Sequence, residues 1–100
     1  MRVEFSKEFE KAVRKLSGKM LDSVRQTVQE VINAGSIDEL TDCKKLVDYE
    51  FIYRIRIGNF RAFFSYHVQI VDDCVKFLYL IPRGQAYDKK MGKNLQRNDV

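Results

Sequence analysis

Residues 51–68 read FIYRIRIGNFRAFFSYHV, and this pattern predicts two strands joined by a tight turn. Apolar and polar side chains largely alternate on both sides of Gly58-Asn59, and such alternation is typical of half-buried strands. A glycine-first pair between two alternating runs is compatible with a type II′ hairpin turn. We therefore expect strands over about 51–57 and 60–68, with position 57 opposite 60 and position 56 opposite 61.

The segments around this hairpin predict two helices and two further strands. Residues 6–18 and 20–35 carry apolar side chains at helical spacing, with Gly18 at the end of the first helix. Residues 2–5 alternate like a short strand. Residues 74–81 are almost all apolar and predict a central strand that is buried on both faces.

The order of these elements predicts an α+β fold. An N-terminal strand and a two-helix hairpin are expected to pack on one face of a mostly antiparallel four-stranded sheet, with a short basic C-terminal segment. Residues 36–48 show no clear period, and residues 88–96 predict only a short, frayed helix. The sheet face that carries arginines is expected to be at least partly open.

The composition is that of one globular domain over residues 1–100, with 45% hydrophobic and 32% charged residues. No stretch approaches the ~18 apolar residues of a membrane span. The N-terminus lacks the apolar region of a secretory signal, so we expect a cytoplasmic protein without a membrane partner. Cys43 and Cys74 lie far apart and His67 is the single histidine, so we expect free thiols and no metal site.

The positive charge is confined to one part of the chain. Residues 1–40 contain seven Lys/Arg and seven Asp/Glu, whereas residues 41–100 contain eleven and seven, so the second segment holds the whole net charge of +4. Such an offset suggests a phosphate-bearing partner, most simply a nucleic acid.

Arginines of the hairpin are the strongest candidates for a functional site. Arg54 and Arg56 are two residues apart and point to the same face of one strand, and the expected register sets Arg56 opposite Arg61. Like charges directly opposite one another destabilise a sheet, whereas guanidinium groups suit phosphate. Arg83 and Tyr87 follow the last strand and are expected at the same edge.

Other interpretations of these side chains stay open. The arginines are alternatively a solvated face, paired with the carboxylates of Asp48, Glu50 or Asp72. His67 is a weaker candidate general base, since it alone titrates near neutral pH, but a lone histidine in a strand is more often a packing or surface residue. Phe63 is the one aromatic expected beside the arginines as a base-stacking platform. Lysines that either contact phosphates or are merely solvated are Lys44, Lys45, Lys89 and Lys90.

Two segments resemble a known group of proteins. Residues 53–61, YRIRIGNFR, resemble the Y-R-I-R-I-G-x-Y-R hairpin of the RelE/ParE superfamily of toxins from bacterial toxin–antitoxin pairs. Residues 82–87, PRGQAY, resemble its H-R-x-x-x-Y ending, and the order of elements fits over nearly the whole chain. The resemblance implies a small toxin that a cognate protein antitoxin neutralises. In the RelE branch the implied activity is cleavage of messenger RNA on the ribosome.

The resemblance also implies roles for single residues. Arg61, Arg83 and Tyr87 match positions that serve catalysis in the RelE branch, and Arg54 and Arg56 match positions that handle RNA phosphates. The implied reaction is attack of an RNA 2′-hydroxyl on the adjacent phosphate, without metal or cofactor. In it Arg61 binds the phosphoryl oxygens, Arg83 stabilises the developing charge, and Tyr87 accepts a proton.

Two positions depart from the superfamily pattern. Pro82 stands where a histidine is frequent, and arginines stand at 54 and 56 where RelE itself uses lysines. Because arginine stays protonated, both are poor general bases. The alternatives are a ParE-like inhibitor of DNA gyrase, a non-catalytic RNA-binding module, which needs exposed aromatics beside the arginines, and an inactive toxin kept as an interaction domain.

Overall fold

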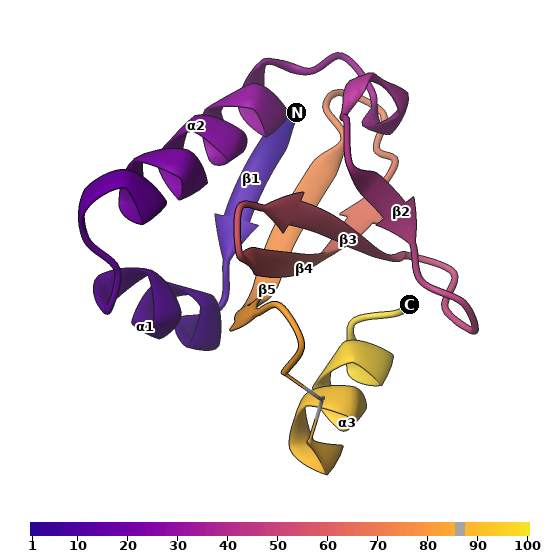
Figure 1. Cartoon of the computed structure of the whole chain (residues 1–100). Helices are drawn as coiled ribbons and strands as arrows, with labels where there is room; N and C mark the ends of the chain where they lie inside the picture. Colours follow the sequence, from indigo (N-terminus) through magenta and orange to yellow (C-terminus); the bar gives the residue numbers. More distant parts are fainter. Residues whose placement is uncertain (86–87) are drawn as a thin grey trace.

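The computed structural model describes residues 1–85 and 88–100, in which five strands form one sheet in the order β1-β5-β4-β3-β2. The strands are β1 (Arg2–Phe5), β2 (Cys43–Lys45), β3 (Ile52–Ile57), β4 (Phe60–His67) and β5 (Cys74–Pro82). The helical elements are α1 (Lys7–Arg14), α2 (Gly18–Asn33), the 3-10 turn η1 (Ile37–Glu39) and α3 (Lys89–Arg97). Figure 1 shows α1 and α2 on one side of the sheet and α3 on the other, so the predicted α+β class is confirmed.

The first helix begins at a serine cap but ends earlier than expected. The Ser6 hydroxyl accepts a hydrogen bond from the Phe9 N–H at 3.1 Å and donates to the Leu78 carbonyl at 2.6 Å, which ties the start of α1 to β5. The helix ends at Arg14 because its last turn tightens into 3-10-type hydrogen bonds. Gly18 opens α2 instead of ending α1, with a φ of +59° that glycine adopts without strain.

The main hydrophobic core lies between α1, α2 and one face of the sheet. Phe9 of α1 and Val24 and Val31 of α2 are each at most 2% exposed. They pack on a sheet surface made of Ile55, Ile57, Ala62, Phe64, Val75, Phe77 and Leu80. Burial of each large apolar side chain contributes about 1.5–3 kcal/mol, so this layer fixes which face of the sheet the helices cover. None of the described helices combines the length and apolar character needed to span a bilayer.

The β3–β4 hairpin has the predicted register. Ile57 is opposite Phe60, and Arg56 is opposite Arg61. Gly58 has a φ of +55°, the sign that a type II′ turn requires at its first central position. Alternation and turn chemistry alone were therefore enough to place these strands.

The sheet has five strands, not the four that were expected. The additional strand is β2, which pairs with β3 at the sheet edge inside the segment 36–48. Three residues are too few to show an alternating pattern, so no strand was predicted there. Among the described strands only β1 and β5 pair in parallel, so the sheet is mostly antiparallel as predicted.

Strand β5 is internal and buried on both faces, as predicted. The register with β4 shifts between Phe63 and Phe64, so β5 carries one extra residue at this point. Because of this bulge, Leu78 and Tyr79 both pack on the face opposite α1 and α2, while Phe77 before them packs toward the helices.

The C-terminal helix is a packed element rather than a frayed one. The Asp88 carboxylate caps α3 by accepting a hydrogen bond from the Met91 N–H at 2.7 Å. Met91 and Leu95 are 5% and 0% exposed and form a second core with Ile52, Phe63 and Leu78. The sheet face that carries the arginines is therefore partly covered. Two apolar residues in nine give a weak helical pattern, which is why this contact was not predicted.

Candidate functional site

Three arginines share the sheet face opposite α1 and α2, and we call this surface the arginine face. Arg56 lies directly opposite Arg61, and Arg54 lies opposite Phe63. The edge strand extends the row, because Lys44 of β2 lies opposite Arg54. Residues paired across strands point to the same side, so the sheet itself brings four cations together.

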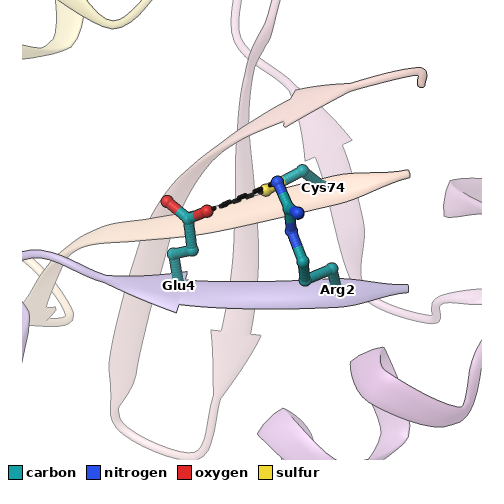
Figure 2. A network of polar contacts seen from close by, with 3 residues as sticks. All are labelled: Arg2, Glu4 and Cys74. Atoms are coloured by element: carbon teal, nitrogen blue, oxygen red, sulfur yellow. Dashed lines mark hydrogen bonds and ion pairs between the residues drawn. The ribbon is translucent and has the colours of Figure 1, made fainter. Parts of the chain in front are cut away.

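These guanidinium groups lack acidic partners. In the described part of the chain, the ion pairs are Arg2–Glu4 at 3.6 Å and Arg14–Glu10 at 3.7 Å, so no carboxylate there pairs with the arginine face. Figure 2 shows the contrast at the opposite edge of the sheet, where the Glu4 carboxylate lies against Arg2 and also accepts a hydrogen bond from the Cys74 thiol at 3.7 Å. The described residues therefore do not form the alternative arrangement, a solvated face in which the arginines pair with acidic residues.

Two buried nitrogens strengthen this point. The Nε atoms of Arg54 and Arg61 are buried and have no hydrogen-bond partner among the described residues. A buried donor without an acceptor costs about 1–3 kcal/mol, and more when it belongs to a charged group. An anion placed over this face would accept from the accessible guanidinium nitrogens and would offset the repulsion between Arg56 and Arg61.

The end of β5 brings Arg83 to the hairpin turn. Pro82 is opposite Phe60, and the Arg83 N–H donates a hydrogen bond to the Asn59 carbonyl at 2.6 Å. Arg83 is exposed and lies two residues beyond Ile81, which is opposite Arg61. The predicted convergence of Arg83 with the hairpin is therefore present in the backbone. Tyr87, the remaining predicted catalytic residue, lies outside the described residues.

A hollow of about 260 Å³ lies at the β2 end of the arginine face, lined by Asp42, Cys43, Lys44, Arg54 and Arg56. Burial raises the pKa of the Cys43 thiol to about 11, although the nearby Arg54 charge opposes this shift. Cys43 is therefore a protonated thiol at neutral pH and supplies no thiolate nucleophile or competing anion. The hollow presents mainly cationic groups at its sheet side.

A second hollow of about 260 Å³ lies at the β5 end, lined by Glu8, Tyr79, Ile81, Gln85, Asp88, Lys90 and Met91. It borders Ile81, the residue opposite Arg61, so it adjoins the same face. Tyr79 is held there by the side chain of Asn94, whose amide nitrogen donates to the phenol oxygen at 2.5 Å.

The four predicted lysines lie at different places in the fold. Lys44 joins the arginine face, whereas Lys45 lies opposite Tyr53 on the helix side and its Nζ donates to the Tyr49 carbonyl at 2.9 Å. Lys89 and Lys90 are exposed at the start of α3. The two neighbouring lysines of β2 therefore cannot act as a pair, because successive strand residues point to opposite faces.

The other candidate general bases are not at this site. His67 is at the far end of β4, opposite Cys74, where its ring stacks on Phe51 at 4.7 Å and contacts the Val100 carbonyl. A hydrogen bond to Asp73 at 2.6 Å, together with burial, raises the pKa of Tyr66 to about 12. Burial raises the pKa of Tyr53 as well. Both tyrosines are neutral at physiological pH.

The packing of the C-terminal helix on the sheet was not predicted from the sequence. Met91 and Leu95 cover Phe63, which is 1% exposed and so offers no base-stacking surface. The interpretation as a non-catalytic RNA-binding module therefore loses the one aromatic side chain that was expected to stack on RNA bases. Asp99 accepts hydrogen bonds from the backbone N–H groups of Glu50 at 2.9 Å and Phe51 at 2.5 Å, which fixes the end of the chain beside β3. No local sequence signal indicates this contact.

Comparison with known proteins agrees with this geometry. No protein-family model matches the chain. The curated protein Toxin RelE3 of Methanocaldococcus jannaschii is 30% identical over 89 residues, which cover 88% of this chain and 97% of that protein. A chain of the archaeal RelE-RelB complex from Pyrococcus horikoshii is 29% identical, with a TM-score of 0.66 over 85% of this chain and 97% of that chain.

A third similarity concerns the fold alone. The isolated E. coli RelE toxin is 16% identical and covers 96% of each chain with a TM-score of 0.63. The three similarities extend over most of the sequence, and the curated toxin reaches 30% identity over nearly its whole length. This chain therefore belongs to the RelE family of toxins.

Proposed function

We propose that this toxin is an mRNA endoribonuclease that cleaves RNA by attack of a 2′-hydroxyl on the adjacent phosphate. The observation that carries the proposal is the unpaired arginine face, where Arg56 and Arg61 lie opposite one another and the Nε atoms of Arg54 and Arg61 lack acceptors. A phosphodiester supplies the negative charge that this arrangement lacks, and its oxygens accept hydrogen bonds from guanidinium groups.

In the proposed reaction the 2′-oxygen bonds to phosphorus and the bond from phosphorus to the 5′-oxygen breaks. The products are a 2′,3′-cyclic phosphate and a 5′-hydroxyl. The phosphorane gains negative charge, so fixed cations stabilise it more than the substrate, and one well-placed donor typically contributes ~10²–10³ in rate. Arg61 binds the phosphoryl oxygens, and Arg83, held at the turn by Asn59, stabilises charge at the leaving oxygen.

Proton transfer is assigned to Tyr87. Its phenolate, which neighbouring positive charge favours by lowering the pKa from ~10, takes the 2′-hydroxyl proton, and the departing 5′-oxygen takes a proton from water. The arginines stay protonated and cannot serve as bases. Tyr53 and Tyr66 are excluded from this role by their raised pKa values and by their place on the helix side of the sheet. The reaction uses no metal and no cofactor.

The remaining cations of the arginine face are assigned to binding the phosphates next to the cleaved bond. Arg54, Arg56 and Lys44 form a continuous row across β3 and β2, and the row runs away from Arg61. Lys89 and Lys90 would meet RNA from α3, whereas Lys45 is withdrawn from the group because it faces the helix side. The messenger RNA is presented by the translating ribosome.

A protein antitoxin is the second proposed partner. The similar Pyrococcus horikoshii structure is a RelE-RelB complex, and the net charge of +4 favours an acidic partner. Addition of the cognate antitoxin should give a stable complex on gel filtration and should stop cleavage. A cleavage rate that is unchanged in a saturated complex would contradict this assignment.

The decisive experiment compares the purified wild type with Arg61→Ala and Arg83→Ala. Each protein is added to a translation reaction and to free mRNA, and the cuts are mapped by primer extension. We expect discrete cuts in translated regions with the wild type, cyclic phosphate ends, and a rate at least ~10²-fold lower for each variant. Arg14→Ala is the matched control, because Arg14 lies on α1 and pairs with Glu10.

Three results would overturn the proposal. If both site variants cleave at the wild-type rate, and circular dichroism shows that they have the native fold, the two arginines take no part in the reaction. Loss of cleavage in the Arg14 variant as well would indicate a non-specific charge effect. Intact mRNA together with stalled replication in cells would instead identify DNA gyrase as the target.

A further inference from the structure

Tyr79 of β5 is a phenol on the arginine face that the proposed reaction does not use. It lies opposite Phe63, and Ile81, two residues further along β5, lies opposite Arg61. Alternate residues of a strand point to the same side, so Tyr79 and Arg61 share a face and are diagonal neighbours across β4 and β5. Diagonal neighbours are ~7–8 Å apart, which is within reach of aromatic and long side chains. Tyr79 is therefore next to the guanidinium that binds the phosphoryl oxygens in the proposed reaction.

The phenol oxygen of Tyr79 is fixed by the C-terminal helix. The side-chain amide of Asn94 donates a hydrogen bond to it at 2.5 Å, and α3 itself is packed on this face by Met91 and Leu95. A phenol that accepts a hydrogen bond still has its own proton to donate. Within residues 1–85 and 88–100, no group accepts that proton. Tyr79 is therefore a fixed donor with an uncommitted proton.

The ring of Tyr79 borders open space as well as the core. It is half-buried and lines, together with Ile81, the hollow of about 260 Å³ at the β5 end of the arginine face. Two residues beyond Ile81, the backbone of Arg83 is tied to the hairpin turn. A substrate held by Arg61 and Arg83 can thus reach the phenol through this hollow.

The proposed cleavage has a particular need for a proton donor. Its 5′-oxygen leaves as an alkoxide, which is about as basic as hydroxide, and water has a pKa of ~15.7. A positioned general acid typically contributes ~10²–10⁴ in rate to such a step. Arg61 and Arg83 stabilise the charge, but a guanidinium keeps its protons and is a poor acid. Without a further group, the departing oxygen is protonated by water alone.

We propose that Tyr79 is the general acid of the cleavage and that Asn94 is its positioning residue. The inference rests on the proposed function, because it concerns the same reaction. As the bond from phosphorus to the 5′-oxygen breaks, its electron pair stays on that oxygen and the phenol proton moves to it. The phenolate that remains keeps the hydrogen bond from Asn94 and then takes a proton from water, so the net proton still comes from the solvent. Tyr87 and Tyr79 then serve as base and acid for the two oxygens that exchange at phosphorus.

The test compares two mRNAs that differ in one atom. Each has a free 2′-hydroxyl at the mapped cleavage position and 2′-O-methyl groups on the neighbouring riboses, and the leaving 5′-atom is oxygen in one and sulfur in the other. A thiolate needs no proton to leave, since thiols have a pKa of ~8.5. Tyr79→Phe keeps the ring and removes only the hydroxyl. We expect its single-turnover cleavage on programmed ribosomes to fall ~10²-fold or more with oxygen and by less than about threefold with sulfur.

Two further variants separate the proton from the packing. Asn94→Asp puts a carboxylate where the amide lies, so it accepts the phenol proton instead of donating to the oxygen. We expect it to reproduce the oxygen-specific loss. Tyr49→Phe is the matched control, because it removes a hydroxyl from another tyrosine that is partly buried against the second core. It should cleave both mRNAs at the wild-type rate, and circular dichroism should show the native fold in all three variants.

Three results would overturn this role of Tyr79. An equal loss with oxygen and sulfur in Tyr79→Phe would mean that the hydroxyl supports binding or packing. An undiminished rate with oxygen would mean that no proton passes through it. An oxygen-specific loss in Lys90→Gln instead would give the role to the ammonium that lines the same hollow. Each of these results leaves Arg61 and Arg83 in place, whereas a wild type that cuts neither mRNA would refute the proposed function and this role together.

Discussion

Replacement of Arg61 should raise stability while it abolishes activity. Arg61→Met keeps an unbranched apolar stem and removes the guanidinium, whose buried Nε has no acceptor among the described residues and which lies opposite Arg56. Relief of the unpaired donor contributes about 1–3 kcal/mol, and relief of the like-charge pair contributes up to about 1 kcal/mol.

The net gain is smaller than the sum of these terms. The guanidinium loses its remaining hydration contacts on replacement, so we expect a free energy of unfolding higher by about 1–2 kcal/mol. For a domain of this size each 1 kcal/mol shifts Tm by about 4–8 °C. The cleavage rate should fall at least ~10²-fold, because a donor to the transition state is lost.

Urea unfolding followed by circular dichroism measures the first effect, and the translation assay measures the second. Arg14→Met is the matched control on α1. It breaks the exposed pair with Glu10, so we expect it to lose at most about 0.5 kcal/mol and to cleave normally. A less stable Arg61→Met protein, or one that gains no more than the control, would refute the conclusion that the arginine face is strained without its ligand.

Three further predictions concern the fold and its titrating groups. Leu95→Ala should lower the free energy of unfolding by about 2–5 kcal/mol in urea, since Leu95 is 0% exposed, and a loss below about 1 kcal/mol would place α3 outside the cooperative fold. The pKa of Tyr66 is raised to about 12 by its bond to Asp73, so the advantage of the wild type over Tyr66→Phe should hold below pH ~10 and vanish as pH rises through about 12; an advantage that stays constant over this range would contradict it. Because burial raises the pKa of Cys43 to about 11, its thiol should react with an aromatic disulfide at pH 8 far more slowly in the folded protein than in urea, and equal rates would show that it is not shielded.

Local chemistry made the hairpin predictable. Gly58-Asn59 selects the turn, and the alternation around it selects the faces, so the opposition of Arg56 and Arg61 follows from neighbouring residues alone. The same holds for the start of α1, where a serine precedes a helical run with acids in its first turn. Each of these features needs only a few adjacent residues.

Other elements exist only because of distant contacts. The three residues of β2 are held by their pairing with β3. Helix α3 is stabilised by the packing of Met91 and Leu95 against sheet residues such as Ile52 and Phe63, which lie more than 20 residues earlier in the chain. The pattern of β2 is too short to be recognised alone, and that of α3 predicted only a short, frayed helix, because tertiary burial rather than local propensity stabilises both.

By itself, the sequence determined the α+β class, the hairpin register and the excess of charge in residues 41–100, because periodicity, turn residues and charge are local properties. Only the tertiary structure decided that the Arg83 N–H bonds to the Asn59 carbonyl, that Lys44 joins Arg54 while Lys45 does not, and that α3 covers Phe63. These depend on which strands pair, on a one-residue bulge in β5, and on burial between segments far apart in the chain. Such contacts form because they lower the free energy of the whole fold, and that free energy cannot be judged from a short stretch of sequence.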